Sequence, residues 1–276
     1  MIGAVPRDGH DDCVTAAFAG PTALHYRRYR RDVPEVLLDR LVEHVELPGD
    51  AIALDLGAGT GQVAVPLAAR VGAVLAMEPE PDMLAQLRRR SEEDNVANLV
   101  CVLGSDQDVP ALLNSVGRGG CGLLTVANAL HWMDAPALFA AADRGLASGG
   151  AIAIITHGIP LWLTDADWAR ALNVYLADWF GRPLTASCGS DAAALRERRD
   201  QLVAAGFTEV AVLEHRYQAD VDVDYVIGHL YSALDADVLP VARRPDFEDG
   251  LRQALRRFQE EPMQEDLLVT ALVGRR

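Results

Sequence analysis

The sequence contains no lysine, so all 25 of its basic residues are arginine. The absence of lysine excludes an enzyme that forms a Schiff base through a lysine, and it excludes the lysine-containing phosphate loop of nucleoside triphosphatases. The basic residues are also too few to balance the acidic ones, and the net charge is −15. Because such a chain is not attracted to phosphate backbones or anionic membranes, we expect no nucleic acid and no membrane among its partners.

Long hydrophobic runs are missing as well. Apolar runs such as Ala151 to Thr156 have the length of a strand, whereas a membrane-spanning helix needs about 20 apolar residues. The N-terminal stretch carries Asp8, Asp11 and Asp12 and lacks the basic start and apolar run of a secretion signal. We therefore expect a cytoplasmic protein without a transmembrane segment.

Cysteines are few and lie far apart. Cys13, Cys101, Cys121 and Cys188 form no Cys-x-x-Cys pair, and two of them lie inside or beside apolar runs. Zinc sites and disulfide frameworks show closer and more regular cysteine spacings. We expect these thiols to be reduced and structural, and we expect no metal site.

The rest of the chain alternates between short apolar runs and amphipathic stretches. After an aperiodic, flexible arm over residues 1–20, a helical pattern runs from Pro21 to Val45. The predicted strands are 51–56, 73–77, 99–103, 122–127 and 151–156, and the predicted helices between them are 63–69, 82–90 and 135–146. Gly149-Gly150 is interpreted as a helix terminator. Strands that alternate with helices predict an α/β fold with a parallel sheet.

The regular alternation lapses after His157. A helix over 191–205, a strand over 209–217 and a final strand over 267–273 are still predicted. Two insertions, at about 157–190 and 218–263, lie outside this scaffold, and the first is rich in aromatic residues. We predict that residues 21–276 form one domain in which these insertions make a helical lid over the substrate. The alternative is that their aromatic side chains only form the core of a small subdomain.

The strongest motif follows the first strand and reads Asp55-Leu56-Gly57-Ala58-Gly59-Thr60-Gly61. Glycines let the backbone bend tightly and approach a ligand closely, and ligands of open α/β sheets bind at the carboxyl ends of the strands. Gln62 stands where a dinucleotide-binding turn has its third glycine, which argues against NAD. Asp55, and Glu78 at the end of the next strand, suit a ligand with a cationic amine and a ribose, and they would repel a pyrophosphate.

The stretch from Asp55 to Gln62 resembles the first motif of the class I S-adenosylmethionine-dependent methyltransferases, and the resemblance spans residues 23–160. It implies a seven-stranded, mostly parallel Rossmann-like sheet with helices on both faces, in which the last strand, 267–273, is antiparallel. It also implies S-adenosyl-L-methionine as cofactor and S-adenosyl-L-homocysteine as product. A nucleotide-binding oxidoreductase stays the alternative, although the Tyr-x-x-x-Lys pair of short-chain dehydrogenases is absent.

The resemblance assigns a set of cofactor-binding residues to the glycine turn, the ends of the following strands and the first helix. They are Asp55, Gly57, Ala58, Gly59, Glu78, Pro79, Met83, Ser105, Asp106, Asn128 and Tyr29. Asp55 and the glycines would line the methionine part, and Glu78 would hold the ribose hydroxyls. The segment from Gly104 to Pro110 resembles the adenine-binding segment, and either Ser105 or Asp106 would contact adenine.

Three further residues are candidates for the catalytic step: His131, His157 and Tyr26. The stretch Asn128 to Asp134 resembles the Leu-His-Trp segment of the ubiquinone-type and trans-aconitate-type branch, where the His-Trp pair packs at the pocket floor. Because a methylsulfonium is already activated, the enzyme mainly has to align the nucleophile, and a base is optional. Tyr26 lies three residues before Tyr29 on one helical face and would close over the methionine or the substrate. An ordinary structural role is the alternative for each of the three.

The sequence narrows the methyl acceptor mainly by excluding classes of substrate. No Asn-Pro-Pro-Tyr or Asp-Pro-Pro-Tyr tetrapeptide follows the fourth strand, which disfavours nucleobase and protein-amide acceptors, and no lysine and acidic pair frames a metal-dependent catechol site. We predict N- or O-methylation of a small molecule, and the similarity to tailoring enzymes of secondary metabolism implies antibiotic biosynthesis. The alternative is a methyltransferase that acts on tRNA or protein. The sequence leaves open whether the chain forms a homo-oligomer.

Overall fold

The computed structural model describes residues 18–117, 119–184, 191–234, 238–258 and 263–276, so Cys13, Cys188 and most of the predicted N-terminal arm lie outside the described residues. The chain divides into two compact units. The sheet unit comprises Arg31–His157, Gly189–His215 and Val269–Arg276, and the helical unit comprises Met1–Arg30, Gly158–Cys188 and Arg216–Leu268. Each unit is described by itself.

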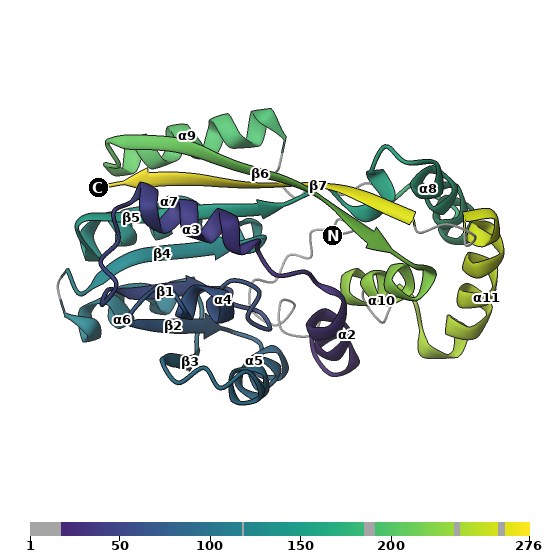
Figure 1. Ribbon diagram of the computed structural model, residues 1–276, viewed down its shortest axis with the longest axis horizontal. Coiled ribbons are helices and arrows are strands. Elements are labelled where there is room, and N and C mark those ends of the chain that lie inside the picture. Colours follow the sequence, from purple (N-terminus) through teal and green to yellow (C-terminus); the bar gives the residue numbers. More distant parts are fainter. Residues whose placement is uncertain (1–17, 118, 185–190, 235–237, 259–262) are drawn as a thin grey trace. The chain divides into compact units, whose positions relative to one another are not determined.

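The sheet has seven strands in the order β3-β2-β1-β4-β5-β7-β6 (Figure 1). The strands are β1 (Ile52–Leu56), β2 (Ala73–Glu78), β3 (Leu99–Leu103), β4 (Cys121–Ala127), β5 (Leu146–His157), β6 (Glu209–Val221) and β7 (Met263–Arg275). The pairs among β1 to β5 are parallel, whereas β7 runs antiparallel to β5. The predicted α/β sheet and its antiparallel last strand are confirmed.

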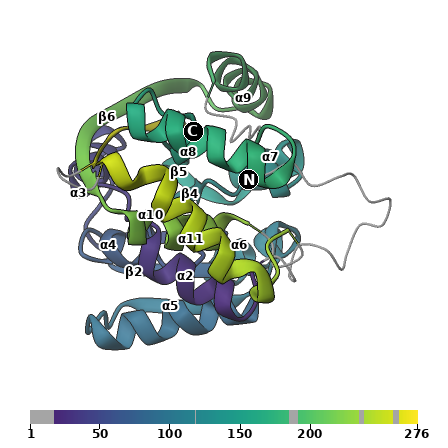
Figure 2. The same ribbon diagram turned by 90° about the vertical axis from the view of Figure 1, so that its right-hand side faces the viewer.

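Helices cover both faces of this sheet. They are α3 (Glu35–His44), α4 (Ala64–Ala68), α5 (Pro81–Glu93), α6 (Val109–Val116), α7 (Ala135–Gly145) and α9 (Ala192–Ala205). Helix α3 contacts α4 on one side, and α6, α7 and α9 pack on one another in sequence on the other side (Figure 2). The right-handed crossovers of parallel strands produce this arrangement, because each connecting helix must return across a face of the sheet.

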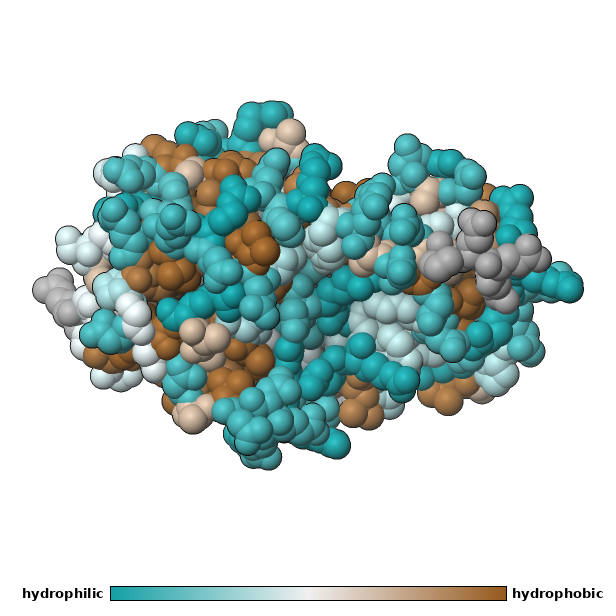
Figure 3. All heavy atoms as spheres, in the orientation of Figure 1, coloured by the Kyte–Doolittle hydropathy of each residue, from teal (hydrophilic) through white to brown (hydrophobic). Residues whose placement is uncertain are grey.

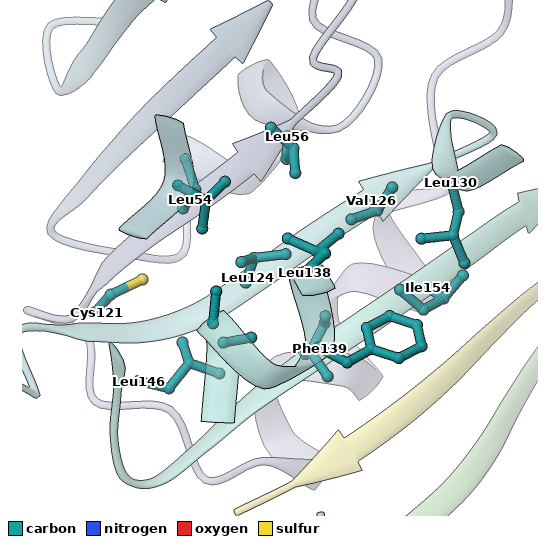
Figure 4. Close-up of a cluster of buried hydrophobic side chains, with 14 of the residues drawn as sticks. Leu54, Leu56, Cys121, Leu124, Val126, Leu130, Leu138, Phe139, Leu146 and Ile154 are labelled. Carbon is teal, nitrogen blue, oxygen red and sulfur yellow. The ribbon is translucent and has the colours of Figure 1, made fainter. Parts of the chain in front are cut away.

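The core on the α7 side shows how the strands orient the site residues. Leu54 and Leu56 of β1 point into a cluster with Leu124 of β4 and with Leu138 and Phe139 of α7 (Figure 4). Successive side chains of a strand point to opposite faces. The residue between the two leucines of β1 therefore points to the opposite face of the sheet.

The helical unit has its own hydrophobic core. Its helices are α2 (Pro21–Tyr29), α8 (Asp167–Phe180), α10 (Val223–Ala233) and α11 (Arg244–Leu255), with the short turn η3 (Leu161–Leu163). Trp168 of α8 and Phe247 of α11 are buried in one cluster with the apolar face of α10. The residues of the predicted lid insertions fall largely in this unit, and their role as a lid stays a prediction.

The single helix predicted from Pro21 to Val45 is wrong. The chain forms α2, leaves the helical conformation at Arg30 and re-enters it at Glu35. Pro34 has an extended backbone (φ −55°, ψ 131°) before the first turn of α3. A proline disfavours the helical conformation in the residue before it and cannot donate a helical hydrogen bond, which accounts for the break.

Two other local predictions are corrected. Gly149-Gly150 does not end a helix, because α7 already ends at Gly145 and both glycines lie within β5, where the register of the β4–β5 pair shifts. Helix α6 was not predicted, although Pro110 stands in its first turn, where proline is favoured.

The surface and the helix lengths agree with the composition. On the face seen in Figure 3, hydrophobic residues form small groups among hydrophilic ones. Exposed large apolar side chains, such as Leu103 and Val36, come from different elements, which is ordinary for a protein surface. Within the described ranges, none of the helices combines the length and the apolar character that a membrane crossing requires.

Candidate functional site

The order of the strands locates the candidate site. β1 and β4 are neighbours, and the chain proceeds from β1 toward β3 on one side and from β4 toward β5 on the other. Such a switch point leaves a crevice outside the carboxyl ends of the two strands, where ligands of doubly wound sheets bind. The glycine turn follows β1, and the segment beginning at Asn128 follows β4.

Neighbouring side chains pack closely against two glycines of the turn. A Cβ atom on Gly57 (φ 65°) would lie 2.7 Å from the Cβ atom of Ala129, and one on Gly61 (φ 95°) would lie 2.5 Å from Cδ1 of Leu87. Two of the three glycines therefore make room for other parts of the chain. Gly59 (φ 58°) is the glycine whose backbone N–H is presented to Glu78.

Glu78 connects the glycine turn to the second strand. One carboxylate oxygen accepts a hydrogen bond from the N–H of Gly59 (2.8 Å) and the other accepts one from the N–H of Glu80 (3.0 Å). The N–H of Ala58 also donates to the carbonyl of Met77 (3.0 Å). Glu78 is buried, and this burial raises its pKa, against the lowering effect of the two backbone N–H groups. Each oxygen keeps a second lone pair that can accept from a ligand hydroxyl.

Asp55 lies beneath the turn, on the face of the sheet away from α7. It is paired in register with Thr125 of β4, whose hydroxyl donates to Oδ1 at 2.7 Å. The other oxygen, Oδ2, is buried and accepts no hydrogen bond from a described residue. The backbone N–H of Ala64 nevertheless acts to lower the pKa of this carboxyl group. Burial raises the pKa of Asp55 to about 7. The partner, Thr125, was missed by the sequence analysis; a threonine amid an apolar strand was the available signal.

A buried arginine, Arg90, is hydrogen-bonded to the end of the glycine turn, and the sequence analysis missed this contact. The guanidinium of Arg90 donates to the carbonyl of Gly61 (3.1 Å) and to both carboxylate oxygens of Asp32 (2.8 and 2.5 Å). The neighbouring Val33 N–H donates to the carbonyl of Gln62 (3.0 Å). The segment between α2 and α3 is thereby fastened to the turn. Neither local pattern nor motif pointed to this contact, because it joins residues 58 positions apart.

The loop after β3 is held by carboxylates. Asp108 accepts hydrogen bonds from the backbone N–H (2.9 Å) and the hydroxyl (3.3 Å) of Ser105. Asp106 accepts from the backbone N–H of Asp134 (3.1 Å), which joins this loop to the loop after β4. Both candidates for the adenine contact are therefore near the switch point, and which of them touches adenine stays open.

The loop after β4 places Asn128 and His131 differently. Asn128 has a left-handed backbone (φ 51°), and its side-chain oxygen accepts from the N–H of His157 at the end of β5 (3.0 Å). His131 is exposed and lies against the ring of Trp132, with 5.1 Å between the ring centroids. The following helix, α7, is capped by Asp134, whose side chain accepts from the N–H of Ala137.

The remaining predicted residues lie in two places. Pro79 is half-buried after β2, and Met83 is buried in the first turns of α5. Tyr26 and Tyr29 belong to the helical unit, where the ring of Tyr29 occupies the space that a side chain on Gly228 would need, 2.2 Å from a Cβ built there. The roles of these residues toward a ligand stay predictions.

Metal-binding groups are not assembled in the part of the chain that the structure describes: no three His, Cys, Asp or Glu side chains gather as a metal site would need. Cys101 and Cys121 are free thiols. Burial raises the pKa of Cys121 to about 11, which leaves this thiol protonated and unreactive at neutral pH.

Comparison with known proteins agrees with this geometry. Residues 53–150, from β1 into β5, match the protein family described as the methyltransferase domain. Residues 53–150 are therefore similar to a methyltransferase domain. The matched residues contain the glycine turn, Glu78 and the loops after β3 and β4, so the resemblance to class I S-adenosylmethionine-dependent methyltransferases is confirmed.

Several curated proteins match part of this chain. An uncharacterized methyltransferase of Mycobacterium tuberculosis is 34% identical over 152 residues, which are 54% of each chain. The methyltransferase ptaI of Pestalotiopsis fici is 24% identical over 211 residues, 70% of this chain and 60% of that protein. The chain thus spans about half the length of the first curated relatives it matches.

Solved structures share the fold. A protein of Anaeromyxobacter dehalogenans, provisionally assigned as a type II methyltransferase, aligns over 90% of this chain and 98% of its own, with a TM-score of 0.59 and 19% identity. The YcgJ protein of Bacillus subtilis aligns over 88% of this chain and 99% of its own, with a TM-score of 0.53 and 16% identity. At these identities the similarity establishes the class I methyltransferase fold and no more.

Proposed function

We propose that this chain transfers the methyl group of S-adenosyl-L-methionine to a small-molecule acceptor and releases S-adenosyl-L-homocysteine. The observation that carries the proposal is the Glu78 carboxylate, which is tied to the glycine turn at Gly59 and lies beside the switch point of the sheet. The family match over residues 53–150 supports a methyltransferase reaction.

The residues at the switch point fit such a cofactor. Glu78 has two oxygens, each with one remaining acceptor position, which matches the two hydroxyls of a ribose. The acidic side chains of Asp55 and Glu78 beside the turn favour a ligand with hydroxyl and cationic groups and disfavour a pyrophosphate. Asp106 or Ser105 after β3 would contact the adenine, and Gly57, Ala58 and Asn128 would border the methionine part.

The chemistry divides between cofactor and chain. The bound cofactor supplies an activated methyl group on a sulfonium. The chain contributes fixed positions: Arg90 and Asp32 hold the exit of the glycine turn, and Asn128 fastens the loop after β4 to β5. Such positioning of two reactants is worth on the order of 7 to 11 kcal/mol. His131 and His157 are the proposed proton acceptors if the acceptor atom carries a proton.

A small-molecule acceptor is proposed on the charge of the chain, because a net charge of −15 opposes binding to nucleic acid. We extend the proposal to N- or O-methylation of a secondary metabolite and to a cytoplasmic location.

Calorimetry with two ligands tests the cofactor assignment. The full chain is titrated with S-adenosyl-L-homocysteine and, separately, with NADH. Saturable heat with the first and none with the second is the expected result, since the turn lacks the dinucleotide spacing. Heat with NADH alone would overturn the proposal.

A second experiment tests the acceptor. Extracts of strains with and without the gene are compared by mass spectrometry. We expect one metabolite of the deleted strain to lack one methyl group (about 14 Da).

A further inference from the structure

Asn128, the first residue after β4, has a backbone conformation that is unusual for its position. Among the described residues other than glycine, a positive φ occurs at Glu46, Asn95 and Asn128. Glu46 and Asn95 lie two residues beyond the ends of α3 and α5, where a left-handed residue commonly closes a helix. Asn128 (φ 51°) instead follows a strand at the switch point of the sheet, so its conformation has another reason.

Two hydrogen bonds fix Asn128 against β5. Its N–H donates to the carbonyl of Ile155 (3.0 Å), and its side-chain oxygen, Oδ1, accepts from the N–H of His157 (3.0 Å). The parallel pairing of β4 with β5 ends at Ala127 and Ile155, so the side-chain oxygen continues this pairing in place of a main-chain carbonyl. The side chain of Asn128 is therefore held in one orientation.

This orientation determines where the NH2 group of Asn128 lies. A backbone N–H can only donate, so the amide atom that faces the N–H of His157 is the oxygen. The NH2 group, Nδ2, is the other branch of the same planar amide and is directed away from that N–H. Because the side chain is exposed, Nδ2 can donate to a ligand. A donor that is already oriented loses little conformational freedom when the ligand binds.

Asn128 lies beside the glycine turn. Strands β1 and β4 are paired with Leu56 opposite Val126, so the turn begins one residue beyond this pair and Asn128 comes two residues beyond it. The next residue, Ala129, is the one whose Cβ atom would lie 2.7 Å from a Cβ atom on Gly57. All of these residues belong to the sheet unit. The NH2 group and the glycine turn are thus parts of one compact unit.

The methionine part of S-adenosyl-L-methionine ends in two groups of opposite charge, an ammonium and a carboxylate. The acidic side chains of Asp55 and Glu78 suit hydroxyl and cationic groups, whereas a carboxylate needs N–H donors. Arg90, at the end of the turn, already donates to Asp32 and to the carbonyl of Gly61. The NH2 group beside the turn supplies a donor of the kind that the carboxylate needs.

We propose that Asn128 donates a hydrogen bond from Nδ2 to the carboxylate of the methionine part of the cofactor. The inference rests on the proposed function, in which Asn128 only borders this part of the ligand. It makes Asn128 a specificity-determining residue, because the hydrogen bond distinguishes the complete cofactor from nucleosides that lack the carboxylate.

The test combines the variant N128D with two ligands. Aspartate keeps the oxygen that accepts from the N–H of His157 and tolerates the left-handed backbone, but it replaces the NH2 donor by a second oxygen. The ligands are S-adenosyl-L-homocysteine and 5′-S-(3-aminopropyl)-5′-thioadenosine, which differs from it only in lacking the carboxylate. Calorimetry with the full chain measures both affinities.

We expect N128D to bind S-adenosyl-L-homocysteine at least tenfold more weakly than the wild type does, and to bind the analogue without the carboxylate no more weakly. N95D is the matched control, because Asn95 is the other described asparagine with a left-handed backbone (φ 54°) and is exposed after α5. It should bind both ligands as the wild type does.

N128G serves if N128D does not fold, because glycine also accepts the left-handed backbone and removes the donor without adding a charge. It is expected to bind S-adenosyl-L-homocysteine more weakly than the wild type does. An equal loss for both ligands in N128D would overturn the proposal, and so would an affinity of N128D or N128G for S-adenosyl-L-homocysteine as high as that of the wild type.

The failure of this inference is separable from that of the proposed function. If the wild type does not bind S-adenosyl-L-homocysteine, the proposed function itself is contradicted. If the wild type binds it and N128D binds it equally well, only the contact between Asn128 and the carboxylate is contradicted.

Discussion

Glu78 and Asp55 are both buried carboxyl groups at neighbouring strands, but their surroundings differ. Glu78 accepts two backbone N–H groups from the glycine turn and the start of α5, so its position depends on two loops. Asp55 accepts one hydroxyl and retains a buried oxygen. The first group is thereby suited to binding a ligand, and the second to supporting the turn from below.

Replacing Glu78 with glutamine tests the ribose contact. We expect S-adenosyl-L-homocysteine to bind E78Q between ten- and a hundred-fold more weakly, because a hydrogen bond to a charged group contributes about 1.5–3 kcal/mol. Calorimetry measures the affinity. E93Q, an exposed glutamate on α5 paired with Arg89, is the control and should bind as the wild type does; wild-type affinity in E78Q would refute the ribose assignment.

Asp55 should make stability depend on pH. Its pKa rises from 3.8 to about 7 on folding because of burial. The folded protein therefore binds this proton between those values while the unfolded chain releases it, and the free energy of unfolding falls as pH rises across that window. Urea unfolding at pH 5 and pH 8 should show this fall to be smaller in D55N than in the wild type. An identical pH dependence in both proteins would contradict the raised pKa.

At the scale of elements, the glycine turn depends on a clamp between α5 and the segment before α3. Arg90 is buried and joins Asp32 to the carbonyl of Gly61. We expect R90Q to lower the free energy of unfolding by about 1–3 kcal/mol, because it leaves the buried carbonyl of Gly61 without its donor. The neighbouring R89Q breaks only an exposed pair with Glu93 and should cost less than about 1 kcal/mol. Urea denaturation compares the two, and equal losses would rule out the clamp.

The contact between the glycine turn and the loop after β4 predicts a packing effect at Gly57. In G57A the new methyl group would meet the Cβ atom of Ala129 at 2.7 Å, at a residue with φ 65°. Gly181 has a similar φ of 67° and open space around it. G181A is therefore the control for backbone strain alone. We expect G57A to lose about 1–3 kcal/mol more stability than G181A in urea denaturation; equal losses would mean that Ala129 does not pack there.

At the scale of the whole molecule, the charge opposes nucleic acid. With a net charge of −15 and no lysine, the chain cannot release many counterions from a phosphate backbone. We expect no change in the fluorescence anisotropy of labelled tRNA at protein concentrations up to about 10 μM, although the dissociation constants of non-specific nucleic-acid binders usually lie between about 1 and 100 μM. Saturable binding below that concentration would favour a macromolecular acceptor.

Much of the sheet unit could be predicted from sequence because its signals are local. Strands β1 to β5 appear as short apolar runs separated by helical periods, and the turn between β1 and α4 requires glycines wherever the chain bends with positive φ. The break at Pro34 was also a local signal and was overlooked. The family resemblance added the seven-stranded sheet and its antiparallel last strand, which no spacing contains.

The amino-acid sequence by itself determined the alternation of strands and helices, the glycine turn and the acid at the end of β2, since these depend on neighbouring residues. Only the tertiary structure decided that Ala129 fills the space beside Gly57, that Thr125 pairs with Asp55 and that Arg90 reaches Asp32. Such contacts join distant positions, and they depend on packing that no local pattern specifies.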